Sequence, residues 1–335
     1  MARILTQRDI EALLPMETCI DLMADVLAAL ARGEAQNPLR TALLMPDRSG
    51  LLGMMPASVA PIHALGIKVV GVFKANHGTE LDAHQGVVLL LDDATGEVRA
   101  ILEAGSLTAI RTAAASGLAT RLLAREDAGD LAILGSGVQA SAHLAAMACA
   151  RPLRRVRVFS PTEERRRAFA ERESARHGLE VEAVDSAHDA VHGADIVCTV
   201  TSSREPVVQG EWLAPGVHVN AAGSSIRTTR ELDTEAVRRA RLFVDKREST
   251  LNEAGDFLFP MREGAIDESH VLGEIGELVL GDVEGRTGPD EITLFKSLGI
   301  AVEDMAAATH VLERAEAEGV GVEVDLTGRA PGHGV

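Results

Sequence analysis

The sequence of 335 residues predicts an α/β protein in which one domain is built around a parallel sheet. From Asp130 onward, short apolar runs alternate with helical segments, which is typical of a parallel sheet with helices on both faces. A glycine-rich turn follows the first of these runs, at Gly135. Before residue 126 the apolar runs are separated by turn residues and indicate a mostly antiparallel sheet. We therefore expect two domains, which suits a chain of this length.

The composition is that of an acidic globular protein. Lys and Arg number 33 against 50 Asp and Glu, so the net charge is −17, while 46% of the residues are hydrophobic. Such a surface repels phosphate backbones, which argues against a nucleic-acid partner. An anionic substrate would need Arg or Lys side chains at its own site.

The cysteines and the apolar runs indicate where the protein works. Cys19, Cys149 and Cys198 are far apart and form no CxxC motif, which favours a reducing compartment and argues against a zinc site. The chain begins without a signal-peptide pattern and has no apolar run of about 18–20 residues that could span a membrane. We expect a cytoplasmic protein without metal or membrane partner.

The first 125 residues are expected to contain two helices and a sheet of about five strands. Apolar spacing predicts one helix over Thr6–Gly33, and Thr6 with Asp9 resembles a capping box. An Ala-rich segment predicts the second helix over Ser106–Leu123. The strands are expected at Thr41–Met45, Leu51–Met55, Gly66–Phe73, Gly86–Leu91 and Val98–Leu102.

The remaining residues are expected to form the parallel sheet and a returning helix. The strands are expected at Leu131–Leu134, Val156–Phe159, Val181–Val184, Ile196–Val200, Val217–Ala221, Leu242–Val244 and Glu291–Leu294. A charged helix is expected over Thr162–His177. The final helix, from about Ile300 to Glu318, has no evident place in this sheet. We expect it to pack on the N-terminal domain, which makes that domain discontinuous, and we expect the tail 329–335 to fray.

The glycine-rich turn predicts a dinucleotide site. Its pattern is G-x-G-x-x-A, directly after a strand and at the start of a helix. Gly135 permits the tight turn, Gly137 lets the backbone approach a pyrophosphate, and Ala140 permits close packing of helix on strand. The free N–H groups of the helix N-terminus then favour an anion. The cofactor-binding residues expected here are Gly135, Ser136, Gly137, Val138 and Gln139.

The end of the next strand bears on the choice of cofactor. An NAD-binding fold usually places Asp or Glu there, whereas this chain has Ser160, followed by Pro161, Thr162 and Arg165. Hydroxyl groups and a guanidinium suit a 2′-phosphate, so NADP(H) is preferred and NAD(H) is possible. The alternative is that Arg165–Arg167 are a solvated face of a helix.

Hydroxyl-bearing residues follow two further strands. Thr199, Val200 and Thr201 end one strand, and Asn220–Ser225 end the next. Carboxyl ends of parallel strands share one edge of a sheet, so these residues would line the nicotinamide side of the crevice. The alternative is that they are loop hydroxyls without a ligand.

Three cations stand out in apolar or helical surroundings: Arg40, Lys68 and Arg111. Lys68 interrupts an apolar strand and Arg111 lies in the middle of the Ala-rich helix. A buried charge is costly unless it is paired, and a substrate carboxylate is one suitable partner. Structural ion pairs or side chains that reach the solvent are the alternative.

Several motifs together resemble the ornithine cyclodeaminase/mu-crystallin family, over about residues 6–316. The matching segments are Leu102–Ala104, Thr108–Ser116, Gly135–Ala140, Asn220–Gly223, Glu231–Asp233, Leu294–Gly299 and Glu303–Asp304. The resemblance implies a Rossmann-type parallel sheet domain inserted in a discontinuous α/β dimerisation and substrate domain. The implied boundaries are 1–125 and 295–335 for the substrate and dimerisation domain and 126–294 for the dinucleotide domain, in a homodimer.

The resemblance also implies roles for individual residues. Arg40, Lys68 and Arg111 match the clamp for the substrate carboxylate, and Lys68 and Arg111 are the expected catalytic residues. Ser225 and Glu253 match positions beside the substrate. The further residues expected to contact the cofactor are His84, Gln85, Arg111, Thr112 and Ser297.

Two departures from the cyclodeaminase pattern indicate a different branch of the family. Gly53 stands where cyclodeaminases have an acidic residue, and Ser225 stands where they have a catalytic aspartate. Without these carboxylates the distal amine of ornithine has no obvious partner or base, although Asp256 or Glu253 could substitute. Both departures resemble the mu-crystallin and ketimine reductase branch.

These observations predict an NAD(P)H-dependent oxidoreductase that reduces the C=N bond of a cyclic ketimine carboxylate. Δ1-Pyrroline-2-carboxylate or Δ1-piperideine-2-carboxylate would give proline or pipecolate. Three alternatives stay open: an ornithine cyclodeaminase, an amino-acid dehydrogenase similar to alanine dehydrogenase, and an NADPH-dependent binder without enzymatic activity.

Overall fold

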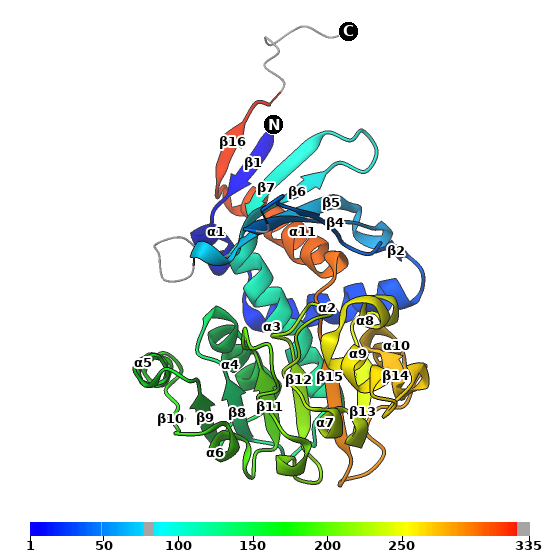
Figure 1. Ribbon diagram of the computed structural model, residues 1–335. Helices are drawn as coiled ribbons and strands as arrows, with labels where there is room; N and C mark the ends of the chain where they lie inside the picture. Colours follow the sequence, from blue (N-terminus) through cyan, green and yellow to red (C-terminus); the bar gives the residue numbers. More distant parts are fainter. Residues whose placement is uncertain (48, 77–83, 327–335) are drawn as a thin grey trace, which may run out of the picture. The chain divides into compact units, whose positions relative to one another are not determined.

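The computed structural model describes residues 1–47, 49–76 and 84–326, and it separates into two compact units (Figure 1). The first unit contains Met1–Pro15, Arg32–Thr108 and Ala301–Val335, and the second contains Met16–Ala31 and Ala109–Ile300. The predicted α/β class with a parallel sheet is confirmed. The predicted tail 329–335 lies outside the described residues.

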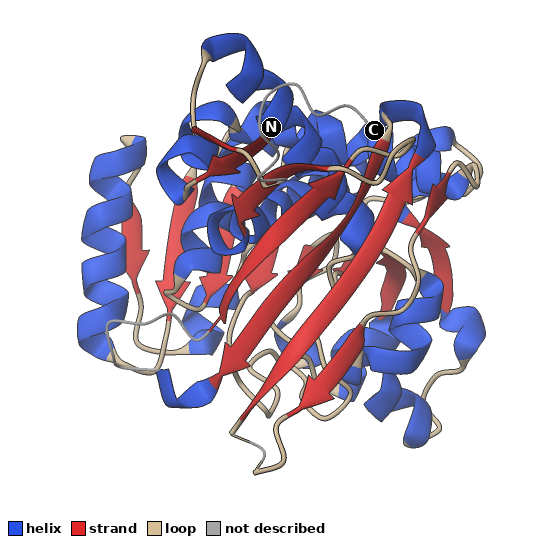
Figure 2. Cartoon of the chain, turned by 90° about the horizontal axis from the view of Figure 1, so that it is seen from above, coloured by secondary structure: helices blue, strands red, loops and turns tan. Residues whose placement is uncertain are grey.

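The first unit contains a mixed sheet with long antiparallel strands, seen side by side in Figure 2. Among the described residues its order is β16-β1-β7-β6-β5-β4-β2, with β3 also paired to β4. The pair β1–β7 is parallel and the other pairs are antiparallel. The strands are β1 (Ala2–Leu5), β2 (Ala35–Gln36), β3 (Thr41–Leu44), β4 (Gly50–Val59), β5 (Ala64–Phe73), β6 (His84–Leu91), β7 (Val98–Glu103) and β16 (Val322–Val324).

One face of this sheet is covered by the returning helix α11 (Ala301–Glu318), which contacts β4, β5 and β6. The contact is close, because a Cβ atom on Gly66 of β5 would lie 2.9 Å from the sulfur of Met305. The short helices α1 (Gln7–Leu13), η1 (Ala60–Ile62) and η2 (Lys74–Asn76) complete the unit. The face that α11 covers also carries Lys68, through the register Ala57↔Gly66 and Met55↔Lys68.

The prediction of a single helix over Thr6–Gly33 is wrong. The capping box of Thr6 and Asp9 is present at α1, but α1 ends at Leu13 and α2 (Met16–Ala31) begins after Pro15. Proline has no N–H to donate and disfavours helical backbone in the preceding residue, so the helix breaks there. α2 then packs in the second unit, where a Cβ on Gly276 would meet the carbonyl oxygen of Leu27 at 2.1 Å.

The second unit is a parallel sheet in the order β10-β9-β8-β11-β12-β15-β13-β14. All its predicted strands are present, while β14 was not predicted because it is short and contains Gly273. The strands are β8 (Asp130–Leu134), β9 (Arg155–Phe159), β10 (Val181–Ala183), β11 (Ile196–Thr199), β12 (His218–Ala221), β13 (Ala240–Val244), β14 (Val271–Glu274) and β15 (Ile292–Lys296).

Helices pack on both faces of this sheet, and two apolar clusters form its core. The helices are α3 (Ala104–Leu123, whose first residues belong to the first unit), α4 (Val138–Ala150), α5 (Glu163–His177), α6 (Ala187–Val191), α7 (Thr234–Arg239), α8 (Arg247–Glu253), α9 (Gly255–Arg262), α10 (Ile275–Leu280), η3 (Gly210–Trp212) and η4 (Glu268–His270). The strand order reverses at β8, which has β9 on one side and β11 on the other. Ligands of such sheets bind outside the carboxyl ends of the strands at this reversal.

The units divide the chain at other places than the predicted boundaries 125 and 294. Residues 16–31, 109–125 and 295–300 belong to the second unit. For α2 the reason is its packing on α10 and α4. For the end of α3 it is a set of buried polar contacts to the parallel sheet, such as Thr293 Oγ1 donating to the carbonyl of Leu123 at 3.1 Å.

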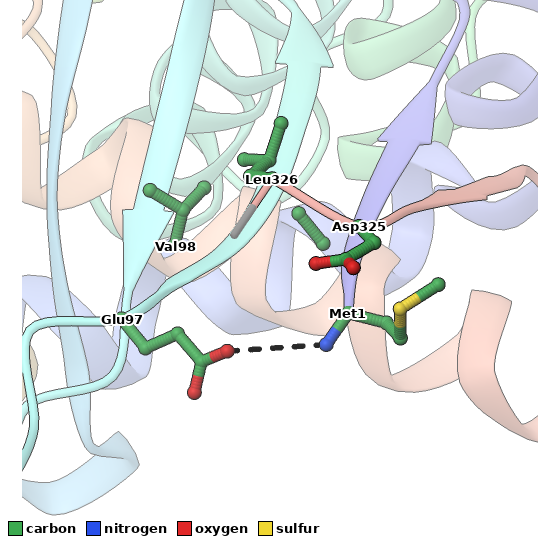
Figure 3. Close-up of a pocket in the computed structure, with 6 residues that line it drawn as sticks. Met1, Glu97, Val98, Asp325 and Leu326 are labelled. Atoms are coloured by element: carbon green, nitrogen blue, oxygen red, sulfur yellow. Dashed lines mark ion pairs between the residues drawn. The ribbon is translucent and has the colours of Figure 1, made fainter. Parts of the chain in front are cut away.

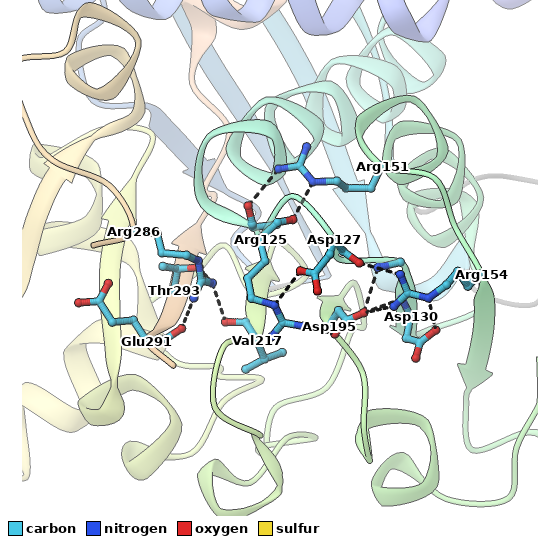
Figure 4. Close-up of polar contacts among 12 residues, drawn as sticks. Arg125, Asp127, Asp130, Arg151, Arg154, Asp195, Val217, Arg286, Glu291 and Thr293 are labelled. Atoms are coloured by element: carbon cyan, nitrogen blue, oxygen red, sulfur yellow. Dashed lines mark hydrogen bonds and ion pairs between the residues drawn. The ribbon is translucent and has the colours of Figure 1, made fainter. Parts of the chain in front are cut away.

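Arginine side chains hold the amino-terminal edge of the parallel sheet together (Figure 4). The carboxylate of Asp195, just before β11, pairs with Arg125 at 2.6 Å and with Arg154 at 2.7 Å. It also accepts the N–H groups of Gly129 and Asp130 at 2.9 and 3.1 Å. This network lies at the edge opposite to the glycine turn, so we assign it to stability.

A small pocket of the first unit lies between β1, the start of β7 and the segment after β16 (Figure 3). Its lining residues are Met1, Ala2, Glu97, Val98, Asp325 and Leu326. The amino group of Met1 lies 3.9 Å from the Glu97 carboxylate, and both side chains are more than half exposed. Solvent screens such a pair, so this pair fixes little charge at the pocket.

Candidate functional site

The glycine turn after β8 has the geometry that a pyrophosphate needs. Gly135 has a φ of +122°, and a Cβ there would lie 2.6 Å from the carbonyl oxygen of Val200. Gly137 is the N-cap of α4, and a Cβ there would meet nothing within 4 Å. The first turn of α4, which starts with the 69%-exposed Val138, therefore faces open space with its N–H groups.

The end of β9 lies beside this turn. The Ser136 hydroxyl donates to the Ser160 hydroxyl at 3.0 Å, and Ser160 is buried. Pro161, Thr162 and Arg165 are exposed. Ser136 and Ser160 therefore come together, with Arg165 on the surface next to them in sequence.

The three arginines that follow have different surroundings. Arg166 is buried and donates to the carbonyl of Ser160 at 3.4 Å and to Asp185 at 2.7 Å. Arg167 is exposed and pairs with Glu163 at 2.7 Å. The interpretation as a solvated helix face therefore fits Arg165 and Arg167, which are exposed, and does not fit Arg166.

The ends of β11 and β12 meet at a buried carboxylate that was not predicted. Glu231 is fully buried, and its Oε2 accepts the Thr199 hydroxyl at 2.8 Å and the N–H groups of Gly223 and Ser224 at 2.8 and 3.2 Å. Its Oε1 accepts the N–H of Thr201 at 2.6 Å. The Thr199 hydroxyl, expected at the cofactor, is thus engaged by Glu231, while the backbone of Thr201 and Ser224 is fixed.

Burial raises the pKa of Glu231, and the nearby charge of Asp256 raises it further. Lys296 and the bonds from Thr201 act in the opposite direction. Three of the four groups bonded to the carboxylate are backbone N–H groups, which can only donate, and the fourth is the Thr199 hydroxyl.

Lys68 forms an ion pair inside the first unit. Its side chain is buried in β5, and its Nζ lies 2.7 Å from a carboxylate oxygen of the equally buried Asp304 and 3.5 Å from the hydroxyl of Thr108. Lys68 therefore has a buried carboxylate as a partner within the first unit, and its role toward a substrate stays a prediction. Asp304 comes from α11, which explains why the chain must return to the first unit.

The other predicted residues of the first unit lie on the same sheet or next to it. Arg40 precedes β3 and is partly buried, and Gln85 is exposed on β6, opposite Gly71. His84 begins β6, and its side chain is outside the described part of the chain. A Cβ on the buried Gly53 would lie 3.2 Å from Val70 Cγ1, so an acidic side chain there would require Val70 to shift.

Arg111 lies at the carboxyl edge of the parallel sheet. Its guanidinium packs on Gly299, where a Cβ would meet Nη1 at 2.4 Å, and the φ of +72° at Gly299 also favours glycine. The Asp245 carboxylate fixes this turn by accepting the N–H groups of Leu298 and Gly299 at 2.6 and 2.7 Å. Arg111 is only 3% exposed, which is the burial expected of a group that binds a carboxylate away from water.

The remaining predicted residues of the second unit are at the same edge. Ser297 follows β15 and donates its N–H to Ala221 at 3.0 Å, and Thr112 is buried next to Arg111. Ser225 is partly exposed after β12, and Glu253 is partly buried at the end of α8. The second unit thus gathers the predicted cofactor residues at one edge. Among the described residues, no group of three or more His, Cys, Asp or Glu could hold a metal.

Lys296 and Asp304 were missed as parts of the site, whereas Asp256 was considered only as a substitute carboxylate. Lys296 ends the buried strand β15 and is 1% exposed, so the reasoning that singled out Lys68 could have found it. Its Nζ lies 2.9 Å from Asp256, which is 2% exposed, so the carboxylate considered as a substitute base is buried in an ion pair. The sequence carries no signal that says which buried carboxylate meets which lysine.

Comparison with known proteins identifies the family to which this chain belongs. The sequence model of the ornithine cyclodeaminase/mu-crystallin family matches residues 1–319. A Δ1-pyrroline-2-carboxylate reductase of Bacillus cereus is 36% identical over 94% of this chain and 97% of its own length. The ketimine reductase mu-crystallin of the mouse is 38% identical over 84% of this chain and 86% of its own length.

Two solved structures are similar over nearly the whole chain. The Δ1-pyrroline-2-carboxylate reductase of Thermococcus litoralis, in complex with NADH and L-proline, is 39% identical with a TM-score of 0.94 over 96% of this chain and 100% of that chain. A dimeric archaeal alanine dehydrogenase with bound NAD is 30% identical with a TM-score of 0.91 over 97% and 99%. In the part of the chain that the structure describes, no helix is long and apolar enough to cross a membrane.

Proposed function

The chain belongs to the ornithine cyclodeaminase/mu-crystallin family, and from this premise we propose that it is an NAD(P)H-dependent reductase of cyclic ketimine carboxylates. The substrates are Δ1-pyrroline-2-carboxylate or Δ1-piperideine-2-carboxylate, and the products are proline or pipecolate. The observation that carries the proposal is the 39% identity over nearly the whole chain to a reductase whose structure holds NADH and L-proline.

The residues at the carboxyl edge of the parallel sheet fit a nicotinamide dinucleotide. The open space at Gly137 and the first turn of α4 would hold its pyrophosphate. Ser160, Thr162 and Arg165, with no carboxylate at the end of β9, support NADP(H) as the preferred form and NAD(H) as a possible one. When bound, the cofactor supplies the hydride that the imine carbon receives.

Side chains of the protein would bind the substrate and supply the proton that its nitrogen receives. Arg40, Lys68 and Arg111 are proposed to hold the carboxylate, which concentrates positive charge in a protein whose net charge is −17. The protonated imine is the better hydride acceptor, so a proton must reach its nitrogen. Lys68, whose Nζ lies 2.7 Å from Asp304, or a water held beside it supplies that proton.

Ornithine cyclodeaminase activity is disfavoured by the two departures at Gly53 and Ser225. The distal ammonium of ornithine would enter a pocket without a carboxylate at either position, and its desolvation would be uncompensated. An amino-acid dehydrogenase similar to alanine dehydrogenase would use the same clamp on an acyclic imine. The 30% identical archaeal alanine dehydrogenase keeps this second candidate in the test below.

A homodimer is part of the proposal. The sheet face opposite to α11 carries apolar side chains that are exposed, such as Leu43 (61%), Leu52 (37%) and Val87 (40%). Leu43 and Leu52 are directly paired, so they form one patch. A second copy of the chain would cover this face. The cytoplasm stays the proposed location, on the spacing of the cysteines.

The test is a panel of substrates with absorbance at 340 nm. Cyclic ketimines with NADPH or NADH, pyruvate with ammonia, and ornithine with NAD+ separate the candidates. Oxidation of the reduced cofactor by ketimines, and by neither of the others, is the expected result.

A further inference from the structure

A single buried carboxylate connects the two loops that follow β11 and β12. Glu231 accepts from Thr199 and Thr201 on the first loop and from Gly223 and Ser224 on the second, at 2.6–3.2 Å. A Cβ on Gly223 would lie 2.4 Å from both Glu231 Oε1 and the nitrogen of Thr201. The two loops are therefore too close for a side chain at Gly223, and the carboxylate lies between them.

A second layer fixes Glu231 itself. Asp256 accepts the N–H groups of Glu231 and Leu232 at 2.7 and 3.0 Å and pairs with Lys296 at 2.9 Å. Lys296 in turn donates to the carbonyls of Ala221 and Ser224 at 3.1 and 2.5 Å. The loop after β12 is thus bonded from its N–H groups by Glu231 and from its carbonyl groups by Lys296.

These loops lie on one particular side of the glycine turn. Gly135 packs against Val200, so the end of β11 touches the turn where the pyrophosphate is expected. β9, whose end carries Ser160, lies on the other side of β8. Because the adenosine half of a dinucleotide is recognised at the β9 side, the other half must extend over β11 and β12.

We propose that Glu231 is a positioning residue. It fixes the loops after β11 and β12, on which the nicotinamide half of the cofactor would lie. It touches neither cofactor nor substrate in this role. It acts through the backbone of Thr201 and Ser224, which it holds in register with each other. The proposal rests on the proposed function only in assuming a nicotinamide cofactor, and it does not depend on the identity of the ketimine.

The hydrogen-bond partners of Glu231 favour a carboxylate over an amide at this position. Three of the groups that contact Glu231 are backbone N–H groups, which can only donate, and they reach both of its oxygens. In Glu231→Gln one oxygen becomes an NH₂ group, which cannot accept from the N–H groups that it then faces. The loops must then separate or rotate to relieve the repulsion. The glycine turn and Ser160 have no bond to Glu231, so the adenosine side should keep its geometry.

The experiment compares Glu231→Gln with the wild type in binding and in turnover. Titration calorimetry measures the dissociation constants of NADPH and of 2′-phospho-ADP-ribose, a fragment that lacks nicotinamide. We expect NADPH to bind about tenfold more weakly while the affinity for the fragment stays within about twofold. With a ketimine as substrate, kcat should fall by about 10- to 100-fold, because hydride transfer depends on position.

Two further variants complete the design. Glu235→Gln alters an exposed glutamate of α7 that pairs with Arg238 at 2.7 Å, and it should change neither affinity. Thr199→Val removes one of the four donors and should shift the ratio of the two affinities in the same direction by a smaller factor, so it serves if Glu231→Gln does not fold. An unchanged ratio of NADPH to fragment affinity in these two site variants would overturn the proposal.

Failure of the proposed function would look different. A wild-type protein that binds NADPH but reduces no ketimine contradicts the proposed substrate. The ratio of the two affinities would still decide the role of Glu231, since it is measured without substrate.

Discussion

At the scale of single residues, the fold buries charged side chains of the proposed site in pairs. Lys68 and Asp304 are 3% and 0% exposed, and their charged atoms are 2.7 Å apart. Removing one partner of such a pair leaves an uncompensated charge, whereas replacing both with apolar groups is much less costly. The pair therefore permits a test in which stability and activity separate.

We predict that Asp304→Asn lowers the free energy of unfolding by about 3–5 kcal/mol. The double variant Lys68→Met, Asp304→Leu should recover part of this loss in urea denaturation, yet it should lack reductase activity because the cation is gone. Glu316→Gln, which alters an exposed partner of Arg99 at 3.3 Å, is the matched control. A double variant that is fully active would exclude Lys68 from the chemistry.

The cofactor preference is also decided by single residues. Ser160→Asp places a carboxylate where a 2′-phosphate is expected, and like charges repel there. We predict a shift in preference from NADPH toward NADH, measured as the ratio of kcat/KM for the two cofactors. Ser269→Asp, at an exposed serine of η4 before β14, is a control at the opposite end of the strand order. A higher kcat/KM with NADH than with NADPH in the wild type would count against the assignment.

The site could be predicted from the sequence where function requires an unusual residue. Gly135, Gly137, Lys68 and Arg111 break local rules of composition, and the structure gives each of them a specific environment. Glu231 could not be assigned in this way, because glutamate is ordinary in a loop. Its burial depends on Thr199 and Gly223, which long-range pairing of strands brings to it.

At the scale of the elements, apolar runs predicted the strands of both sheets better than they predicted the ends of helices. The buried strands of the parallel sheet have few alternatives once helices separate them. β1 and β16 were missed because each is short and pairs with a segment far away in sequence, as Ala2 does with Val324. The break at Pro15 was missed because apolar spacing continues across it, although proline itself was the signal.

The amino-terminal edge of the parallel sheet gives a prediction about pH. Burial alone would raise the pKa of Asp195, but the N–H groups of Gly129 and Asp130 and the charges of Arg125 and Arg154 outweigh it and lower the pKa. A lowered pKa means that the ionised group stabilises the fold above its unfolded pKa, and that this contribution is lost as the pH falls through the folded pKa.

We therefore predict that Asp195→Asn destabilises the protein by about 1–2 kcal/mol at pH 7, a value discounted because Arg154 is half exposed. The difference from the wild type should persist down to the ordinary pKa of an aspartate and shrink below it. Denaturation curves of both proteins at several pH values measure this. A difference that stays constant down to the lowest pH would contradict the assigned charge.

At the scale of the whole molecule, the exposed apolar face of the first unit points to self-association. Leu52→Arg places a charge in the patch formed with Leu43, and we predict that it converts a dimer to a monomer in analytical ultracentrifugation. Leu272→Arg, at another exposed leucine (39%), on β14 of the second unit, should leave the dimer intact. A wild-type protein that is monomeric at micromolar concentration would refute the proposed interface.

We propose that this member of the family, which has Gly53 and Ser225, reduces ketimines and does not deaminate ornithine. The most direct measurement uses two parallel reactions of the wild-type protein. One contains Δ1-pyrroline-2-carboxylate and NADPH and is followed at 340 nm, and the other contains ornithine and catalytic NAD+ and is assayed for ammonia and proline. We predict steady oxidation of NADPH in the first and no ammonia in the second. Steady release of ammonia from ornithine, without oxidation of NADPH by the ketimine, would contradict the account.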